Sequence, residues 1–112
     1  AAGYWRVRVA AMARALEGQC IVVQAVTVGT AAWCPAVDEN TGCPGFFGPP
    51  DTGFPSNGIL ALGAADKPGW TFAEIDLSTV ANVRKNGQVL NKTHWDEQAT
   101  SDQNPSLQRL WP

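Results

Sequence analysis

The stretch "RALEGQCIVVQAVTVGT", residues 14–30, decides the fold because the chain changes there from helical to extended character. Apolar side chains recur at helical spacing over residues 4–17, which predicts a helix. Gly18 is then expected to take the left-handed conformation that closes a helix. The β-branched run that follows, residues 20–27, predicts a strand buried on both faces.

The rest of the chain predicts a mixture of loops, strands and one more helix. Residues 29–57 are rich in glycine and proline, so we expect an irregular segment without helix or central strand. Two strands are predicted at 58–63 and 70–77, joined by the turn "AADKPG". Asp76 or Ser78 is expected to cap a short helix over residues 78–85, which the turn signal Asn86-Gly87 ends.

The composition favours a packed chain that meets another chain over part of its surface. Hydrophobic residues make up 45% of the 112 residues, charged residues only 16%, and there are five tryptophans. The net charge is −2 and the basic residues are scattered, which argues against nucleic acid as a partner. We find no membrane-spanning run and no signal-peptide pattern, so we expect a cytoplasmic protein with reduced thiols.

The cysteines and the single histidine are the first candidates for chemistry. Cys20 follows a helix C-terminus, where the negative end of the helix dipole disfavours a thiolate, so we interpret it as a buried apolar residue. Cys34 and Cys43 lack zinc-site spacing, and a disulfide between them is an open alternative. We expect neither a metal nor a cofactor. The residue types alone allow a nucleophilic site made by Cys34, His94 and Asp96.

Three segments resemble a known superfamily. These are "ARALEGQCIVVQAVTVG" (13–29), "GFFGPPDTGFPSNGILALG" (45–63) and "GWTFAEIDLSTVANVRKNGQVLN" (69–91). They resemble consecutive segments of the nitrilase or carbon–nitrogen hydrolase superfamily, and the likeness covers residues 3–97. It implies that residues 1–97 are the C-terminal part of such a domain and that 98–112 form a polar tail.

The resemblance implies a fold and a chemistry. The fold is an α/β (α+β) arrangement, a partial four-layer α-β-β-α sandwich that self-association would complete. Family members hydrolyse amides and nitriles through a glutamate, a lysine and a nucleophilic cysteine. That triad lies upstream of the matched segments, so no catalytic role passes to Cys20, Cys34 or Cys43. The chain is therefore expected to be weak or inactive alone.

The resemblance also suggests where the substrate pocket and the subunit contacts lie. The turn after the buried strand would lie near the substrate pocket, through Val26, Thr27 and Trp33. Glu17 and Gly18 would be structural, with Glu17 pairing with an arginine. The helix over residues 4–17 and the chain after Leu77 would lie close to subunit contacts.

Three functional hypotheses follow. The first is a segment of an amide- or nitrile-hydrolysing enzyme that forms a homo-oligomer. The second is a small stand-alone hydrolase using Cys34, His94 and Asp96. The third is a non-catalytic module that assembles with itself to cover unpaired strands.

Overall fold

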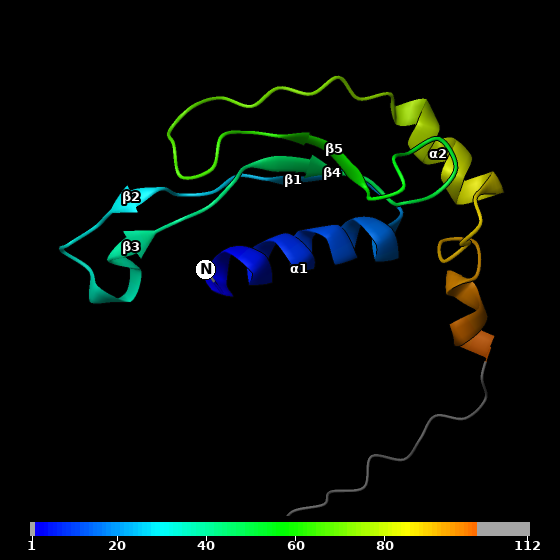
Figure 1. Ribbon diagram of the computed structural model, residues 1–112. Coiled ribbons are helices and arrows are strands. Elements are labelled where there is room, and N and C mark those ends of the chain that lie inside the picture. Colours follow the sequence, from blue (N-terminus) through cyan, green and yellow to red (C-terminus); the bar gives the residue numbers. More distant parts are fainter. Residues whose placement is uncertain (1, 101–112) are drawn as a thin grey trace, which may run out of the picture.

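The chain combines one long helix with short antiparallel strands, in a computed structural model that describes residues 2–100 (Figure 1). The fold class is therefore α plus β, as the sequence predicted. The elements, in chain order, are α1 (Ala2–Gly18), β1 (Val22–Gln24), β2 (Gly29–Thr30), the 3-10 helix η1 (Pro35–Val37), β3 (Glu39–Asn40), β4 (Gly45–Phe47), β5 (Ile59–Leu62), α2 (Leu77–Asn86) and the 3-10 helix η2 (Trp95–Thr100). The helix predicted over residues 4–17 is confirmed as α1.

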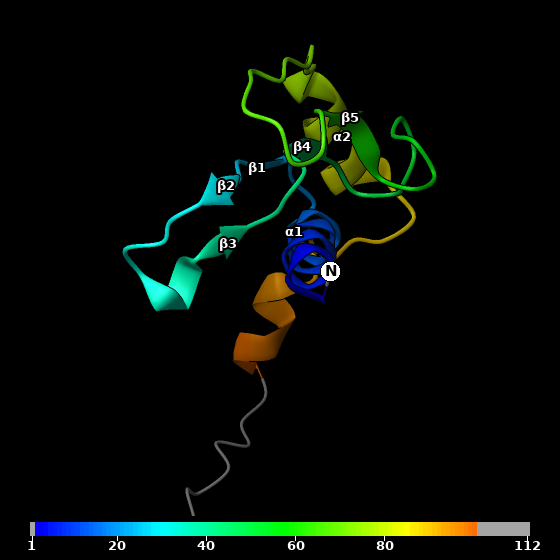
Figure 2. The ribbon, with the colours of Figure 1, turned by 60° about the vertical axis from the view of Figure 1, so that its left-hand side comes forward.

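Strands β1, β4 and β5 form an antiparallel sheet in the order β1-β4-β5. Val23 pairs with Phe46, which pairs in turn with Ala61, and a register shift follows between Phe46 and Phe47. A second pair, β2 and β3, forms a hairpin that extends away from the sheet (Figure 2). α1 packs against β1 and β4, so one face of the sheet is covered by this helix.

The middle strand of the sheet lies in the region predicted to be irregular, so that prediction was wrong for residues 45–47 and for β2 and β3. β4 is only three residues long and lies between Pro44 and Pro49, so neither proline interrupts its ladder. Gly45 is needed there, because an added Cβ would come within 2.8 Å of the Phe47 ring. The flanking prolines therefore limit the length of this strand, but they do not prevent the strand from forming.

The strand predicted over residues 20–27 is shorter and more open than expected. Only Val22–Gln24 pair in the sheet. Successive side chains point to opposite faces, and Gln24 faces α1 whereas Val23 is 60% exposed on the other side. The prediction of burial on both faces was therefore wrong for residues 2–100, because no second layer within them covers the face that carries Val23.

Of the two strands predicted downstream, the first is confirmed as β5 and the second is not formed. Residues 70–76 have no strand partner in the described chain, and the backbone there is extended and irregular. Trp70 is 90% exposed and Phe72 is 81% exposed. The alternating pattern of this segment describes a strand, but a strand needs a neighbouring backbone to hydrogen-bond with.

The second helix agrees with the sequence. α2 begins where the Asp76 carboxylate accepts a hydrogen bond from the Ser78 N–H at 2.8 Å, and hydrogen bonds from Ser78 hold the pKa of Asp76 below its usual range. Gly87 ends the helix by donating its N–H to Val83 O. Of the tail predicted at 98–112, residues 98–100 belong to η2 and the remainder lies outside the described residues.

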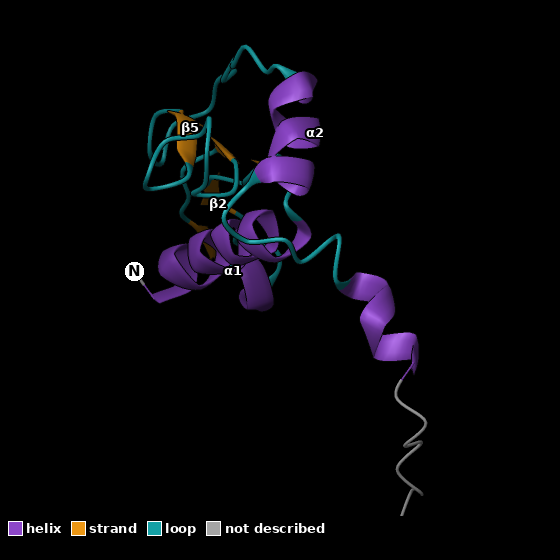
Figure 3. Cartoon of the chain, turned by 90° about the vertical axis from the view of Figure 1, so that its right-hand side faces the viewer, coloured by secondary structure: helices purple, strands orange, loops and turns teal. Residues whose placement is uncertain are grey.

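The buried core residues come from α1, β4 and α2. α2 lies beside the C-terminal end of α1 (Figure 3), where Arg84 donates to the Gln19 carbonyl. Ala15, Phe47 and Val83 are fully buried, and Val80 is nearly so. This is a small core for a chain with so many large apolar residues.

The residue that closes α1 is Gln19 and not Gly18, which corrects the prediction. Gly18 is the last helical residue, and Gln19 takes the left-handed conformation with a φ of 45°. A left-handed conformation costs a residue with a Cβ about 1–2 kcal/mol relative to the right-handed helix. The side chain of Gln19 is only 1% exposed, and the hydrogen bonds it makes there offset that strain.

Gln19 links the end of α1 to the C-terminal third of the chain. Its Nε2 donates to the carbonyl oxygens of Val89 and Val83, and its Oε1 accepts from the Lys92 N–H at 2.9 Å. Its own carbonyl accepts from Arg84 Nε at 2.9 Å. A single buried side chain therefore satisfies three backbone groups that lie more than sixty residues away.

Asp51 makes a second link to the same segment. Its carboxylate accepts from the N–H groups of Gln88 at 2.9 Å, Val89 at 3.1 Å and Thr52 at 2.6 Å. These hydrogen bonds, that of Gln88 first, hold the pKa of Asp51 below its usual range. The turn after β4 is thus attached to the chain that follows α2.

Replacing Gln19 with methionine is expected to lower the free energy of unfolding by about 2–3 kcal/mol, because two carbonyls and one N–H lose their partner. Urea unfolding measures this loss. Gln88→Met is the matched control, since the Gln88 side chain is exposed. An equal loss in both variants would contradict the role assigned to Gln19.

Asp51→Asn is expected to lower the melting temperature at neutral pH. A carboxylate whose pKa is lowered by folding stabilises the fold above about pH 4, and this contribution is lost as the pH falls through the folded-state value. The difference between variant and wild type should therefore shrink on acidification. Melting curves from pH 7 to pH 3 test this, with the exposed Glu74→Gln as control. A difference that does not change with pH would count against it.

Candidate functional site

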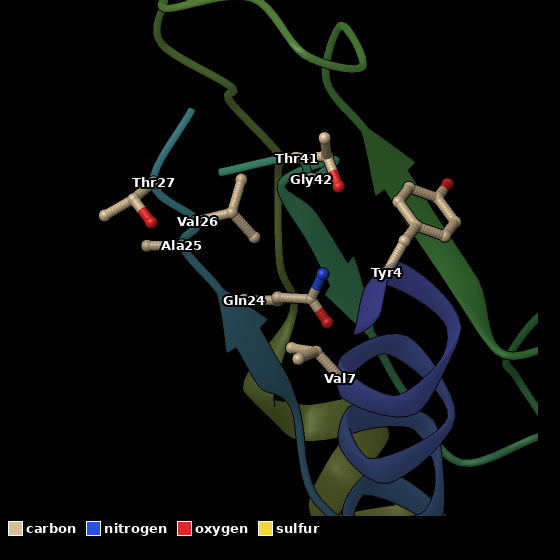
Figure 4. Close-up of a pocket in the computed structure, with 8 residues that line it drawn as sticks. All are labelled: Tyr4, Val7, Gln24, Ala25, Val26, Thr27, Thr41 and Gly42. Carbon is tan, nitrogen blue, oxygen red and sulfur yellow. The ribbon is translucent and has the colours of Figure 1, made fainter. Parts of the chain in front are cut away.

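The most complete site is a cleft between the N-terminal turns of α1 and the chain that leaves β1 (Figure 4). It has a volume of about 290 Å³ and is lined by Tyr4 and Val7 from α1, by residues 24–27, and by Thr41 and Gly42. The walls are therefore partly apolar, and the polar side chains are those of Tyr4, Gln24, Thr27 and Thr41.

Gln24 is the buried polar group of this cleft. It is 9% exposed, and its Nε2 donates to the Cys43 carbonyl at 2.9 Å. Its Oε1 is buried and accepts no hydrogen bond from the described chain. Because the Cys43 carbonyl can only accept, the amide nitrogen must face it, and this fixes the oxygen on the opposite side.

The wall opposite Gln24 is held by a reciprocal pair of hydrogen bonds. The Gly42 N–H donates to the Asp66 carboxylate at 2.7 Å, and the Asp66 N–H donates to the Gly42 carbonyl at 2.8 Å. An added Cβ on Gly42 would lie 2.8 Å from the Val26 side chain, so only glycine fits there without displacing Val26. The shape of this wall therefore depends on Gly42.

Of the three residues that the family resemblance assigned to a substrate pocket, two line this cleft and one does not. Val26 and Thr27 line the cleft, and the Thr27 hydroxyl donates to Asn40 Oδ1 at 2.9 Å. Trp33 lies outside it and is 85% exposed, in the connection between β2 and η1. Glu17 and Arg14 form an exposed ion pair at 2.8 Å, an interaction that contributes little to stability at a protein surface.

The three side chains of the alternative nucleophilic site are not brought together. Cys34 lies just before η1 in the β2–β3 hairpin, at one end of the molecule, whereas His94 lies after α2 at the other end (Figure 1). His94 Nδ1 lies 2.6 Å from the Glu97 carboxylate, so the neighbour that orients the imidazole is Glu97 and not Asp96.

All three cysteines are free thiols. The alternative of a bridge between Cys34 and Cys43 is therefore not realised in this structure. Cys43 is buried, and its thiol lies 3.3 Å from the Gly63 carbonyl. Cys20, expected to be buried, is half-buried, and its thiol lies 3.8 Å from the Arg14 carbonyl at the end of α1.

The described residues show neither a metal-binding cluster nor a membrane-spanning helix. No group of three or more histidine, cysteine, aspartate or glutamate side chains gathers there in a way that could hold a metal ion. None of the helices between residues 2 and 100 is both long and apolar enough to cross a membrane.

Comparison with known proteins gave no relative: no family model, no curated protein and no solved structure matches this chain.

The residue that reasoning from the sequence missed is Gln24. The signal was present, since Gln24 is the single large polar residue within the apolar run of residues 20–26. A polar side chain in such a run is buried with at least one hydrogen bond, or faces a cavity. The partner Cys43 lies nineteen residues further along the chain, so its involvement could not be read from the run itself.

Proposed function

We propose that this chain is the C-terminal part of a carbon–nitrogen hydrolase that acts on amides or nitriles and draws its Glu-Lys-Cys triad from another polypeptide segment. The observation that carries the proposal is the open apolar face of the sheet, opposite α1. An α-β-β-α sandwich needs such a face, since its two sheets pack against each other there.

The open face is apolar, and no helix or strand of the described chain forms a second layer over it. Val23 and Phe46 point to the side away from α1, and Val23 is 60% exposed. Residues 67–71 border this face and form with it a shallow hollow of about 280 Å³, but Trp70 stays 90% exposed. A patch of this kind is unusual on a chain that functions alone, and it fits a surface that another sheet covers.

The extended shape of the chain supports the same proposal. The β2–β3 hairpin extends away from the core, and residues 63–76 form a long connection that runs past the sheet from β5 to α2 (Figure 1). Segments that extend in this way bury their apolar side chains only when another chain or segment lies against them.

The outer side of α1 offers a second apolar surface. Val9, Met12 and Leu16 form with Gly48 and Pro50 a hollow of about 330 Å³ whose walls are almost entirely apolar. This surface suits a contact between subunits, as the family resemblance implies for residues 4–17. We therefore propose a homo-oligomer in which the sheet face and α1 serve different contacts.

The purified chain alone is expected to hydrolyse none of a panel of small amides, nitriles and activated esters, because the proposal places the Glu-Lys-Cys triad in another polypeptide segment and each of these reactions needs an activated nucleophile. The control is the triple variant Cys20→Ala, Cys34→Ala, Cys43→Ala, measured beside the wild type. Turnover by the wild type that the triple variant lacks would contradict the proposal, since one of these cysteines would then be a nucleophile.

Self-association of the isolated chain is expected to depend on the open sheet face. Light scattering at micromolar concentration should give a mass above that of the monomer, and Val23→Asp should shift the mass toward the monomer because a charge would be buried in the contact. Val37→Asp is the matched control, since Val37 is exposed on the hairpin. A monomeric wild type, or an equal effect of both substitutions, would argue against the proposed face.

A further inference from the structure

We infer that the apolar hollow on the outer side of α1 is the docking site for residues 107–111 of a second copy of this chain. The inference rests on the homo-oligomer of the proposed function and deepens it, because it names the segment that fills the α1 contact. It is carried by the composition of the hollow, by the apolar spacing of residues 107–111 and by the direction in which the described chain leaves α1.

The hollow presents apolar side chains that the described chain leaves open to water. Val9, Met12 and Leu16 line it from α1, and Gly48 and Pro50 line it from the turn after β4. Val9 is 59% exposed and Leu16 is 38% exposed. Burial of such side chains against a second apolar surface lowers the free energy, so the hollow of about 330 Å³ favours an apolar occupant.

The C-terminal tail carries apolar residues at a spacing that suits a groove. Residues 101–112, "SDQNPSLQRLWP", lie outside the described residues. Apart from the prolines, the apolar residues in this stretch are Leu107, Leu110 and Trp111. Their spacing i, i+3, i+4 is typical of a segment that lays one apolar side into a hydrophobic groove. The two residues between them are polar, which suits the opposite side that stays in water.

The length of the tail allows this contact. Trp95 lines a surface hollow together with Arg14 and Glu17, so the chain after residue 94 begins beside the C-terminal end of α1. Residues 101–110 span up to about 33 Å when they are extended. The part of α1 that lines the apolar hollow is only about 10 Å long. A tail that starts at the end of one α1 is therefore long enough to reach the hollow of an α1 packed beside it.

The direction of the chain favours a second copy over the chain's own hollow. Arg14 and Glu17 lie on a different side of α1 from Met12, because successive residues of a helix are about 100° apart around its axis. η2 (Trp95–Thr100) then runs away from α1, as the orange segment of Figure 1 and the view in Figure 3 show. In a symmetric pair of copies each tail reaches the partner's hollow and each hollow receives a tail, which closes the contact.

The test is a disulfide cross-link between two variants of the full chain that both carry Cys20→Ala and Cys34→Ala. One variant adds Ala13→Cys, in the wall of the hollow, and the other adds Leu110→Cys, in the tail. Mixed with oxidised glutathione as the oxidant, the two are expected to form a covalent heterodimer that mass spectrometry identifies. Arg14→Cys in place of Ala13→Cys is the matched control, and it should lose the cross-link because Arg14 is exposed on another side of α1.

Light scattering on the full chain gives a second measurement that does not depend on added cysteines. Leu110→Asp is expected to lower the mass of the assembly, because a charge would be placed in the apolar hollow. Gln108→Asp is the matched control in the same tail, and the mass should stay at the wild-type value.

Three results overturn the inference. The first is the absence of the heterodimer, or equal cross-linking through Arg14→Cys. The second is an equal mass for Leu110→Asp and Gln108→Asp. The third comes from a single variant that carries both Ala13→Cys and Leu110→Cys: a link formed only within one chain would make the occupant the chain's own tail.

Failure of this inference is distinguishable from failure of the proposed function. Val23→Asp acts on the open sheet face and the hydrolysis panel reports on the cysteines, so neither tests the α1 hollow. A heterodimer that forms while Val23→Asp leaves the mass unchanged would keep the docked tail and remove the proposed sheet contact. An assembly that depends on Val23 but gives no heterodimer would do the reverse.

Discussion

The structure depends on one buried amide. Gln19 closes α1 in a left-handed conformation and, through the same side chain, holds the carbonyls of Val83 and Val89 and the N–H of Lys92. Besides these bonds, the polar links from α2 and the chain after it to the end of α1 include those that Arg84 and Asn91 donate to backbone carbonyls of residues 17–19, and these donors are more exposed than Gln19. The small core at Ala15, Phe47 and Val83 therefore exists because a polar residue fixes the angle at which its elements meet.

Local patterns predicted the elements that depend on local interactions. The helix spacing over residues 4–17, the capping signal at Asp76 and the Asn86-Gly87 stop all describe interactions within a few residues, and α1 and α2 follow them closely. β5 was also predicted, since its apolar run lies between two turn signals.

The predictions that were wrong concern features that depend on residues far away in the sequence. β4 is a strand because β1 and β5 lie on either side of it, which the prolines around it conceal. Residues 70–77 have the alternation of a strand but no neighbour in the described chain. Gly18 is the expected helix-closing residue, yet Gln19 takes the left-handed conformation because its partners lie beyond residue 80. The cleft follows the same rule. The resemblance suggested Val26 and Thr27 as lining residues, whereas the buried position of Gln24 depends on its hydrogen bond to the distant Cys43 carbonyl and could not be predicted.

The hydrogen bonds of Gln19 join residues separated by 64 to 73 positions. Contacts across such a separation form late in folding, because the entropy of closing the intervening loop must be overcome first. During synthesis on a ribosome, Gln19 emerges long before Val83, Val89 and Lys92. The nascent chain therefore carries α1 with an unfinished C-terminus until residues 83–92 have been made.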